Sequence, residues 1–157
     1  MVKAHRSQHS VQLAVSQLIV TEAFYAGILE LPVQRSFSSP GAPEHLVVDM
    51  DGIAIVFVED NDVVRTHPLL GQRFSMFPKG IGVTLHFEVR DIEGIRDAIL
   101  EEDMEILYHL EEKPYGVKEM WCFDPDGYLV ALEEPVERRT NKLGRAGTLS
   151  ATENLPG

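Results

Sequence analysis

The sequence is poor in cysteine, in basic residues and in long apolar runs, and each shortage excludes a class of protein. Cys122 is the only cysteine among 157 residues, so no disulfide can form within the chain, and a reducing, cytoplasmic location is the simplest expectation. Fourteen Lys and Arg against 25 Asp and Glu give a net charge of -11, which argues against nucleic acid and anionic membranes as partners. The first apolar run is interrupted by Gln12, Ser16 and Gln17, so we expect neither a signal peptide nor a membrane span.

The remaining composition is that of a globular domain. With 44% hydrophobic and 25% charged residues, the chain is long enough to bury a core without covalent staples. Its acidity has two interpretations: it keeps the surface soluble, or it attracts a cationic ligand.

Two copies of one pattern follow each other along the chain. Apolar strand patterns and helical spacing predict, in each copy, a strand, a helix and then three strands. In the first copy the elements with a clear pattern are strands at 11–15, 45–49 and 53–58 and a helix at 21–29. In the second copy they are strands at 83–89 and 105–109 and a helix at 91–102, followed by a closing hairpin. We therefore expect an α+β fold made of two βαβββ modules.

The second copy closes with a hairpin. Val117 to Phe123 is rich in strand-forming residues, Asp124-Pro-Asp-Gly127 forms the turn, and Tyr128 to Leu132 resumes an apolar strand.

The repeat also predicts the domain organisation. We expect one domain over residues 1–135, with module one at about 9–60, a connector at 61–80 and module two at about 81–135. The connector is rich in Pro and Gly, and both a lid over a pocket and a simple linker are open interpretations. Residues 136–157 contain few large apolar side chains and are expected to be a disordered tail.

Several short motifs occur in the order and spacing of a known superfamily. They are Val15-Ser-Gln-Leu18 followed by Phe24-Tyr25, Leu85-His-Phe-Glu-Val-Arg-Asp-Ile92, Pro114-Tyr-Gly116 and Asp124-Pro-Asp-Gly-Tyr128. Together they resemble the glyoxalase, bleomycin-resistance and extradiol-dioxygenase group, the vicinal oxygen chelate superfamily. Gln17 and Glu30 stand where that group commonly has Asp and Gly. The resemblance implies that the two modules pair to form a curved sheet around a central cavity.

Enzymes of this superfamily hold a divalent ion on the first and last strands of both modules. The resemblance places those positions at Ser10, Phe57, Thr84 and Ala131. None of these side chains is a good ligand for Zn, Ni, Fe or Mn, which favour imidazole and carboxylate here. We therefore predict that the protein uses no metal cofactor.

A displaced metal site is the alternative. Two residues further along each strand stand Gln12, Glu59, His86 and Glu133, which a metal-binding glyoxalase would use. His86 and Glu133 are also the candidate catalytic residues, since a histidine beside a carboxylate can act as a general acid or base. The plainer interpretation of His86 is a core-lining residue hydrogen-bonded to Glu133. Cys122, between Trp121 and Phe123, is interpreted as a packed small hydrophobe.

Aromatic residues suggest binding in place of metal chemistry. Phe57 on the cavity face, with Tyr115 and Trp121, would form a stacking surface for a planar or cationic ligand. Gln12, Thr84 and Ala131 would line the same cavity. Metal-free members of the superfamily sequester cationic antibiotics in acidic clefts, commonly as dimers, and the resemblance therefore implies a homodimer.

Three functions are consistent with these observations. The first is metal-independent binding of a small organic, cationic or aromatic, antibiotic-like molecule. The second is a metal-dependent lyase, isomerase or dioxygenase. The third is a structural dimerisation module whose cavity is filled by Phe57 and its neighbours.

Overall fold

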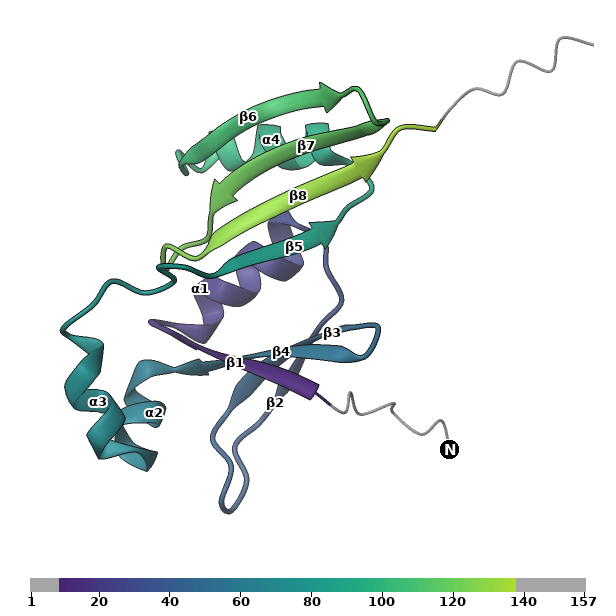
Figure 1. Cartoon of the computed structure of the whole chain (residues 1–157). Helices are drawn as coiled ribbons and strands as arrows, with labels where there is room; N and C mark the ends of the chain where they lie inside the picture. Colours follow the sequence, from purple (N-terminus) through teal and green to yellow (C-terminus); the bar gives the residue numbers. More distant parts are fainter. Residues whose placement is uncertain (1–8, 138–157) are drawn as a thin grey trace, which may run out of the picture.

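A computed structural model describes residues 9–137 and divides them between two modules (Figure 1). Module one forms a four-stranded sheet in the order β1-β4-β3-β2, with β1 parallel to β4 and the other pairs antiparallel. Its elements are β1 His9–Val15, α1 Leu18–Glu22, the π-helix η1 Ala23–Ile28, β2 Val33–Ser36, β3 His45–Met50 and β4 Ile53–Glu59.

Module two repeats this arrangement. Its sheet has the order β5-β8-β7-β6, and β5 is parallel to β8. Its elements are β5 Thr84–Glu88, α4 Ile92–Glu101, β6 Ile106–Lys113, β7 Val117–Phe123 and β8 Leu129–Pro135. The predicted α+β fold of two βαβββ modules is confirmed.

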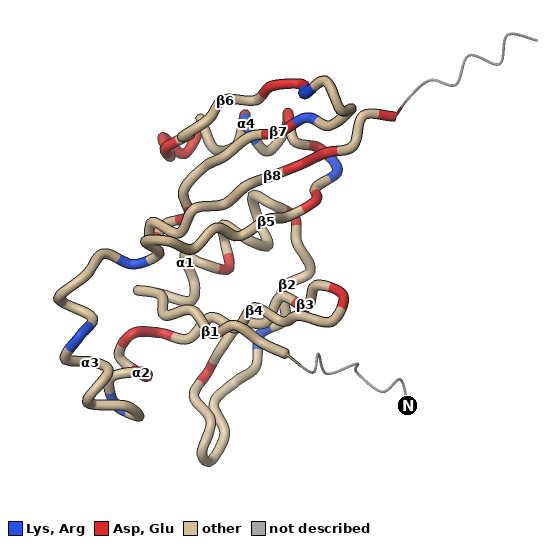
Figure 2. The backbone as a smooth tube through the Cα atoms, in the orientation of Figure 1, with Lys and Arg blue, Asp and Glu red and all other residues tan. Residues whose placement is uncertain are grey.

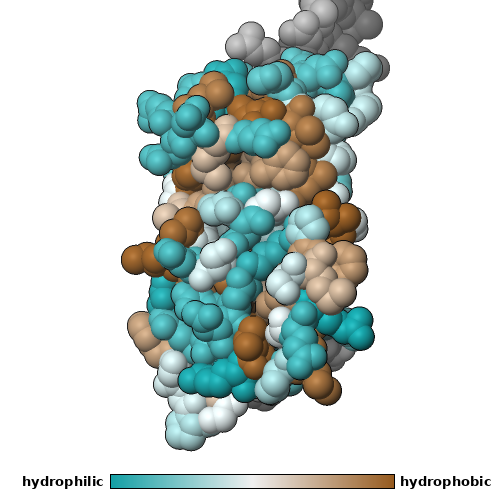
Figure 3. Space-filling model, turned by 90° about the vertical axis from the view of Figure 1, so that its left-hand side faces the viewer, coloured by the Kyte–Doolittle hydropathy of each residue, from teal (hydrophilic) through white to brown (hydrophobic). Residues whose placement is uncertain are grey.

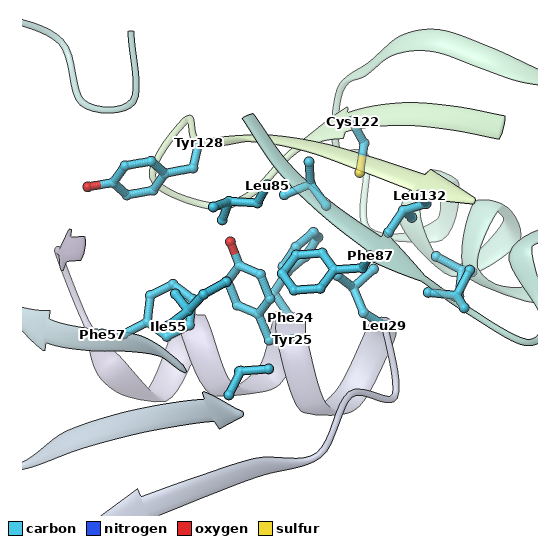
Figure 4. Packing of buried hydrophobic residues seen from close by; sticks show 14 of the residues in the cluster. Phe24, Tyr25, Leu29, Ile55, Phe57, Leu85, Phe87, Cys122, Tyr128 and Leu132 are labelled. Carbon is cyan, nitrogen blue, oxygen red and sulfur yellow. The ribbon is translucent and has the colours of Figure 1, made fainter. Parts of the chain in front are cut away.

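The helices cover one face of each sheet and leave the other face open (Figure 1). Every second residue of each strand points toward the helices, because neighbouring side chains on a strand point to opposite faces. These residues form one core. Figure 4 shows Tyr25 from η1 between Phe57 of module one and Phe87 of module two. The Tyr25 and Phe57 ring centroids lie 4.6 Å apart, and all three residues are at most 2% exposed. The two modules therefore share a core.

The helix of module one begins earlier than the sequence predicted, at Leu18, and it ends at a strained residue. Its last turn is a π-helix in which Leu29 N–H donates to Phe24 O at 2.9 Å. Glu30 follows with φ of 56°, a left-handed conformation that favours glycine.

The connector contains two short helices that the sequence analysis did not predict, α2 Asp60–Thr66 and α3 Pro68–Phe74. In Figure 3 this side of the molecule faces the viewer, and its hydrophobic patches lie apart from one another.

Lys79 pairs with Asp60 and lies 3.5 Å from Asp126 of the β7–β8 turn. The connector therefore ties module one to module two.

A second set of contacts joins the end of β1 to the β7–β8 turn. Ser16 N–H donates to Asp126 Oδ1 at 3.0 Å, and Tyr128 Oη–H donates to Ala14 O at 2.8 Å. The two first strands, β1 and β5, run in opposite directions (Figure 1).

Two further sequence expectations concern the ends of the chain and the membrane. The predicted tail lies outside the described residues except for Val136 and Glu137. Within residues 9–137, no helix is long and apolar enough to cross a membrane.

Candidate functional site

The N-termini of the two main helices show which positions in the two modules are equivalent. Leu18 N–H donates to Glu59 Oε1 at 2.9 Å, and Ile92 N–H donates to Glu134 Oε2 at 3.4 Å. Each helix thus presents its positive end to a carboxylate at the end of its own module's last strand. Glu59 therefore corresponds to Glu134.

This equivalence corrects the expected position of Phe57. If Glu59 corresponds to Glu134, then Val56 corresponds to Ala131, and the strand register agrees, because Gln12 pairs with Val56 as His86 pairs with Ala131. A shift of one residue moves a side chain to the other face of a sheet. Phe57 is fully buried in the core beneath the helices, so its predicted place on the cavity face was wrong.

The displaced metal set is corrected for the same reason. Glu59 accepts a hydrogen bond from Leu18 on the helix side, whereas Gln12 belongs to the opposite face of its sheet. The residue of module one that is equivalent to Glu133 is Val58, which lies on the same face as Gln12 and cannot bind a metal ion. Within the part of the chain that the structure describes, no three His, Cys, Asp or Glu side chains are placed to hold a metal ion. These residues do not fit a resident divalent ion.

The remaining predicted residues of module two lie on the open face of its sheet, which we call the free face. His86 and Thr84 come from β5, Ala131 and Glu133 from β8, and Trp121 from β7. Tyr115 lies in the turn between β6 and β7, where it is 65% exposed. Gln12 and Ser10 lie instead on the open face of module one.

An aromatic row crosses the free face at one level of the strand register. His86 pairs with Ala131, Ala131 pairs with Trp121, and Trp121 pairs with Tyr108. The ring centroid of Trp121 lies 5.8 Å from that of His86 and 5.5 Å from that of Tyr108, both edge to face. Ala131 is fully buried, so it serves as the small floor between the rings. The sequence analysis missed Tyr108, which is 60% exposed.

A glutamate row lies directly beside the aromatic row. Glu88 pairs with Glu133, Glu133 with Glu119, and Glu119 with Glu111, so one carboxylate comes from each of the four strands. At the usual strand spacing of about 4.8 Å the row is about 14 Å long. Figure 2 shows the acidic stretches of these strands gathered toward one end of the sheet.

Hydrogen bonds join the two rows. Trp121 Nε1–H donates to Glu119 Oε1 at 3.0 Å, which fixes the orientation of the indole. Tyr115 Oη–H donates to the other oxygen, Oε2, at 3.4 Å. The pKa of the Tyr115 phenol is raised, first because of desolvation and then because of the charge of Glu119.

The charges of the glutamate row are only partly compensated. Lys113 Nζ binds Glu111 Oε2 at 2.7 Å, at the outer end of the row. Within residues 9–137, no basic side chain forms an ion pair with Glu88, Glu119 or Glu133. Like charges directly opposite each other on neighbouring strands are destabilising, so this arrangement favours a bound cation.

A shallow cleft of about 240 Å³ lies over the outer half of the two rows. It is lined by Tyr108, His109, Glu111, Lys113, Glu119 and Trp121. The predicted hydrogen bond between His86 and Glu133 is absent from the described part of the chain, because the register places Glu133 opposite Glu88. His86 contacts Trp121 instead.

The sequence carries a partial signal for the two rows, although the strand register that joins them is not readable from it. In three strands a glutamate lies two residues from the member of the aromatic row. The glutamate follows that member in β5 (His86, Glu88) and β8 (Ala131, Glu133), and it precedes it in β7 (Glu119, Trp121). The reversal is what an antiparallel neighbour requires.

Comparison with solved structures shows that the chain has the glyoxalase/bleomycin-resistance fold. A superfamily member from Sphaerobacter thermophilus aligns with a TM-score of 0.53 and 20% identity, over 80% of this chain and 94% of that one. A glyoxalase/bleomycin resistance protein/dioxygenase family enzyme from Burkholderia phytofirmans aligns with a TM-score of 0.60 and 16% identity, over 83% and 100%. A lactoylglutathione lyase from Agrobacterium tumefaciens aligns with a TM-score of 0.50 and 16% identity, over 80% and 91%.

These identities support the shared fold alone. No protein-family model matches the sequence, and no curated protein matches it. The resemblance seen in the sequence is thus confirmed as a fold, and function must be argued from the residues of this chain.

Proposed function

We propose that the protein binds a small organic cation with a planar ring on the free face of module two. The observation that carries this proposal is the contact between the aromatic row and the glutamate row. Aromatic faces attract cations, and a partly desolvated contact of this kind contributes about 1 to 2 kcal/mol. A ligand stacked on Trp121 would place its charge beside Glu119.

The donor set supports the proposal that binding needs no metal cofactor. The usual positions carry Ser10, Val56, Thr84 and Ala131, and Glu59 is engaged with the helix of module one. The charge that stabilises the ligand would come from carboxylates of the chain itself. We propose further that the protein works as a cytoplasmic homodimer; sedimentation at several protein concentrations tests the dimer.

Calorimetric titration with N-methylquinolinium tests the proposal, and neutral quinoline serves as the matched ligand. We expect the cation to bind and quinoline to bind at least about tenfold more weakly, which is about 1.4 kcal/mol. Trp121→Leu and Glu119→Gln should each weaken binding of the cation by about 5- to 30-fold. Equal affinity for the two ligands would contradict the proposal.

Glu112→Gln is the control variant. Glu112 lies on the same strand as Glu111, and it pairs with Lys118 on the helix side of the sheet. The Glu112→Gln substitution removes one negative charge, as Glu119→Gln does, but it leaves the free face unchanged. Its affinity for N-methylquinolinium should equal that of the unsubstituted protein.

The competing function is a glyoxalase-type lyase, isomerase or dioxygenase that uses His86 and Glu133. The similarity in fold to a lactoylglutathione lyase and the exposure of His86 on the free face favour testing it. Thermal unfolding of chelator-stripped protein with excess zinc, nickel, manganese or ferrous ion decides, because an ion bound by the folded state alone raises the midpoint. A rise that disappears in His86→Ala would contradict metal-independent binding and favour this function instead.

A further inference from the structure

Acidic and basic residues are distributed unevenly along this chain. Residues 84–137, which form module two, contain sixteen Asp and Glu but four Lys and Arg. The eight residues that follow the described part, Arg138-Arg-Thr-Asn-Lys-Leu-Gly-Arg145, contain four basic side chains and no acidic one. The most basic stretch of the sequence therefore follows the most acidic module directly.

The described chain ends close to the glutamate row. Glu133 belongs to the row and lies two residues before the end of β8 at Pro135. Val136 N–H then donates to Gly116 O at 2.9 Å, which holds the chain beside the turn that carries Tyr115. Four residues separate Glu133 from Arg138.

The lengths are compatible with contact. Eight residues in an extended conformation span up to about 26 to 29 Å. The glutamate row is about 14 Å long at the usual strand spacing. Segment 138–145 is thus long enough to cross the whole row after leaving β8.

We propose that segment 138–145 binds the glutamate row of its own chain and competes there with the cationic ligand. This inference rests in part on the proposed function, because it describes how the same site is regulated. Single exposed ion pairs contribute little, about 0.2 to 1 kcal/mol each. Attachment to β8 compensates for this weakness, because a short tether gives an effective concentration in the millimolar range.

Trp121 provides a direct test without any ligand, since it is the only tryptophan and lies on the free face. The test compares quenching of its fluorescence by acrylamide in the full chain and in the full-length variant R138Q/R139Q/K142Q/R145Q. At low salt we expect about twofold stronger quenching in the variant. At about 1 M salt, where the Debye length is about 3 Å, the two proteins should agree.

Lys3→Gln with Arg6→Gln is the matched control, because it removes two basic residues from the other end of the sequence. It should behave like the unsubstituted chain. Equal quenching of the fourfold variant and the unsubstituted chain at low salt would overturn the proposal. A difference that grows with protein concentration would also overturn it, because the segment would then come from a second copy.

Titration with N-methylquinolinium separates this proposal from the proposed function. We expect the fourfold variant to bind the cation about 3- to 10-fold more tightly than the unsubstituted chain. If the cation binds both proteins equally, competition by the segment is refuted and cation binding stands. If it binds neither while the quenching difference persists, cation binding is refuted and the contact of the segment stands.

Discussion

The Tyr25 hydroxyl donates a 2.8 Å hydrogen bond to Asp124 Oδ2, and this contact joins the helix of module one to the closing turn of module two. Both residues are buried: Tyr25 is fully buried, and Asp124 is 4% exposed. Asp124 Oδ1 accepts the N–H groups of Asp126 and Tyr128, each at 2.9 Å. One carboxylate therefore holds both the turn and the contact between the modules.

Tyr25→Phe should destabilise the protein by about 1.5 to 3 kcal/mol, because it leaves a buried carboxylate oxygen without its donor. Urea unfolding measures the change. Tyr115→Phe is the control, since its hydroxyl bond to Glu119 is exposed and long at 3.4 Å. If Tyr25→Phe lowers the free energy of unfolding no more than Tyr115→Phe does, the role of the contact is contradicted.

Asp124 should also make stability depend on pH. Burial raises the pKa of its carboxyl above the ordinary value of 3.8, more than the hydrogen bond from Tyr25 lowers it. The folded state then holds the proton more tightly than the unfolded state, so this contribution is complete below the ordinary pKa and is lost as pH rises through the folded-state value. We expect the free energy of unfolding of the unsubstituted protein, relative to Asp124→Asn, to fall over that window and then level off. Asp97→Asn, at an exposed site, is the control. A relative stability that rises with pH would show that folding lowers the pKa of Asp124, contrary to this prediction.

Cys122 should be almost unreactive in the folded protein. It is fully buried, and burial raises the pKa of its thiol to about 12. Because the thiolate is the reactive form, reaction with Ellman's reagent at mildly alkaline pH should be at least about 100-fold slower than in denaturant. The single cysteine makes the readout unambiguous. Rapid labelling without denaturant would show that the sheet beneath α4 opens readily.

Glu30→Gly should stabilise the protein. The left-handed conformation of Glu30 costs about 1 to 2 kcal/mol for a residue with a Cβ, and part of this gain is offset by the greater freedom of glycine in the unfolded chain. We expect a net gain of about 0.5 to 1 kcal/mol, seen as a rise in the thermal midpoint of about 1 to 4 °C. Ala98→Gly, inside α4, is the opposite control and should destabilise by about 1 kcal/mol. An unchanged or lower midpoint for Glu30→Gly would contradict the strain.

The sequence by itself determined the repeated order of elements and the closing hairpin, because these depend on local patterns. In β5 the alternation Thr84-Leu-His-Phe-Glu88 also put Thr84, His86 and Glu88 on one face of the strand, and the structure shows that this face is the open one. The sequence also showed that Ser10, Thr84 and Ala131, the positions that the resemblance assigns to a metal site, carry no good metal ligand.

Only the tertiary structure decided which face of β4 is buried. Residues 53–58 read Ile-Ala-Ile-Val-Phe-Val, apolar on both faces, so alternation could not place Phe57, and the position of Glu59 shifted with it. The glutamate row was hidden for a related reason. Its four members are spread over 46 positions, from Glu88 to Glu133, and become neighbours through the register of four strands, which long-range backbone hydrogen bonds determine.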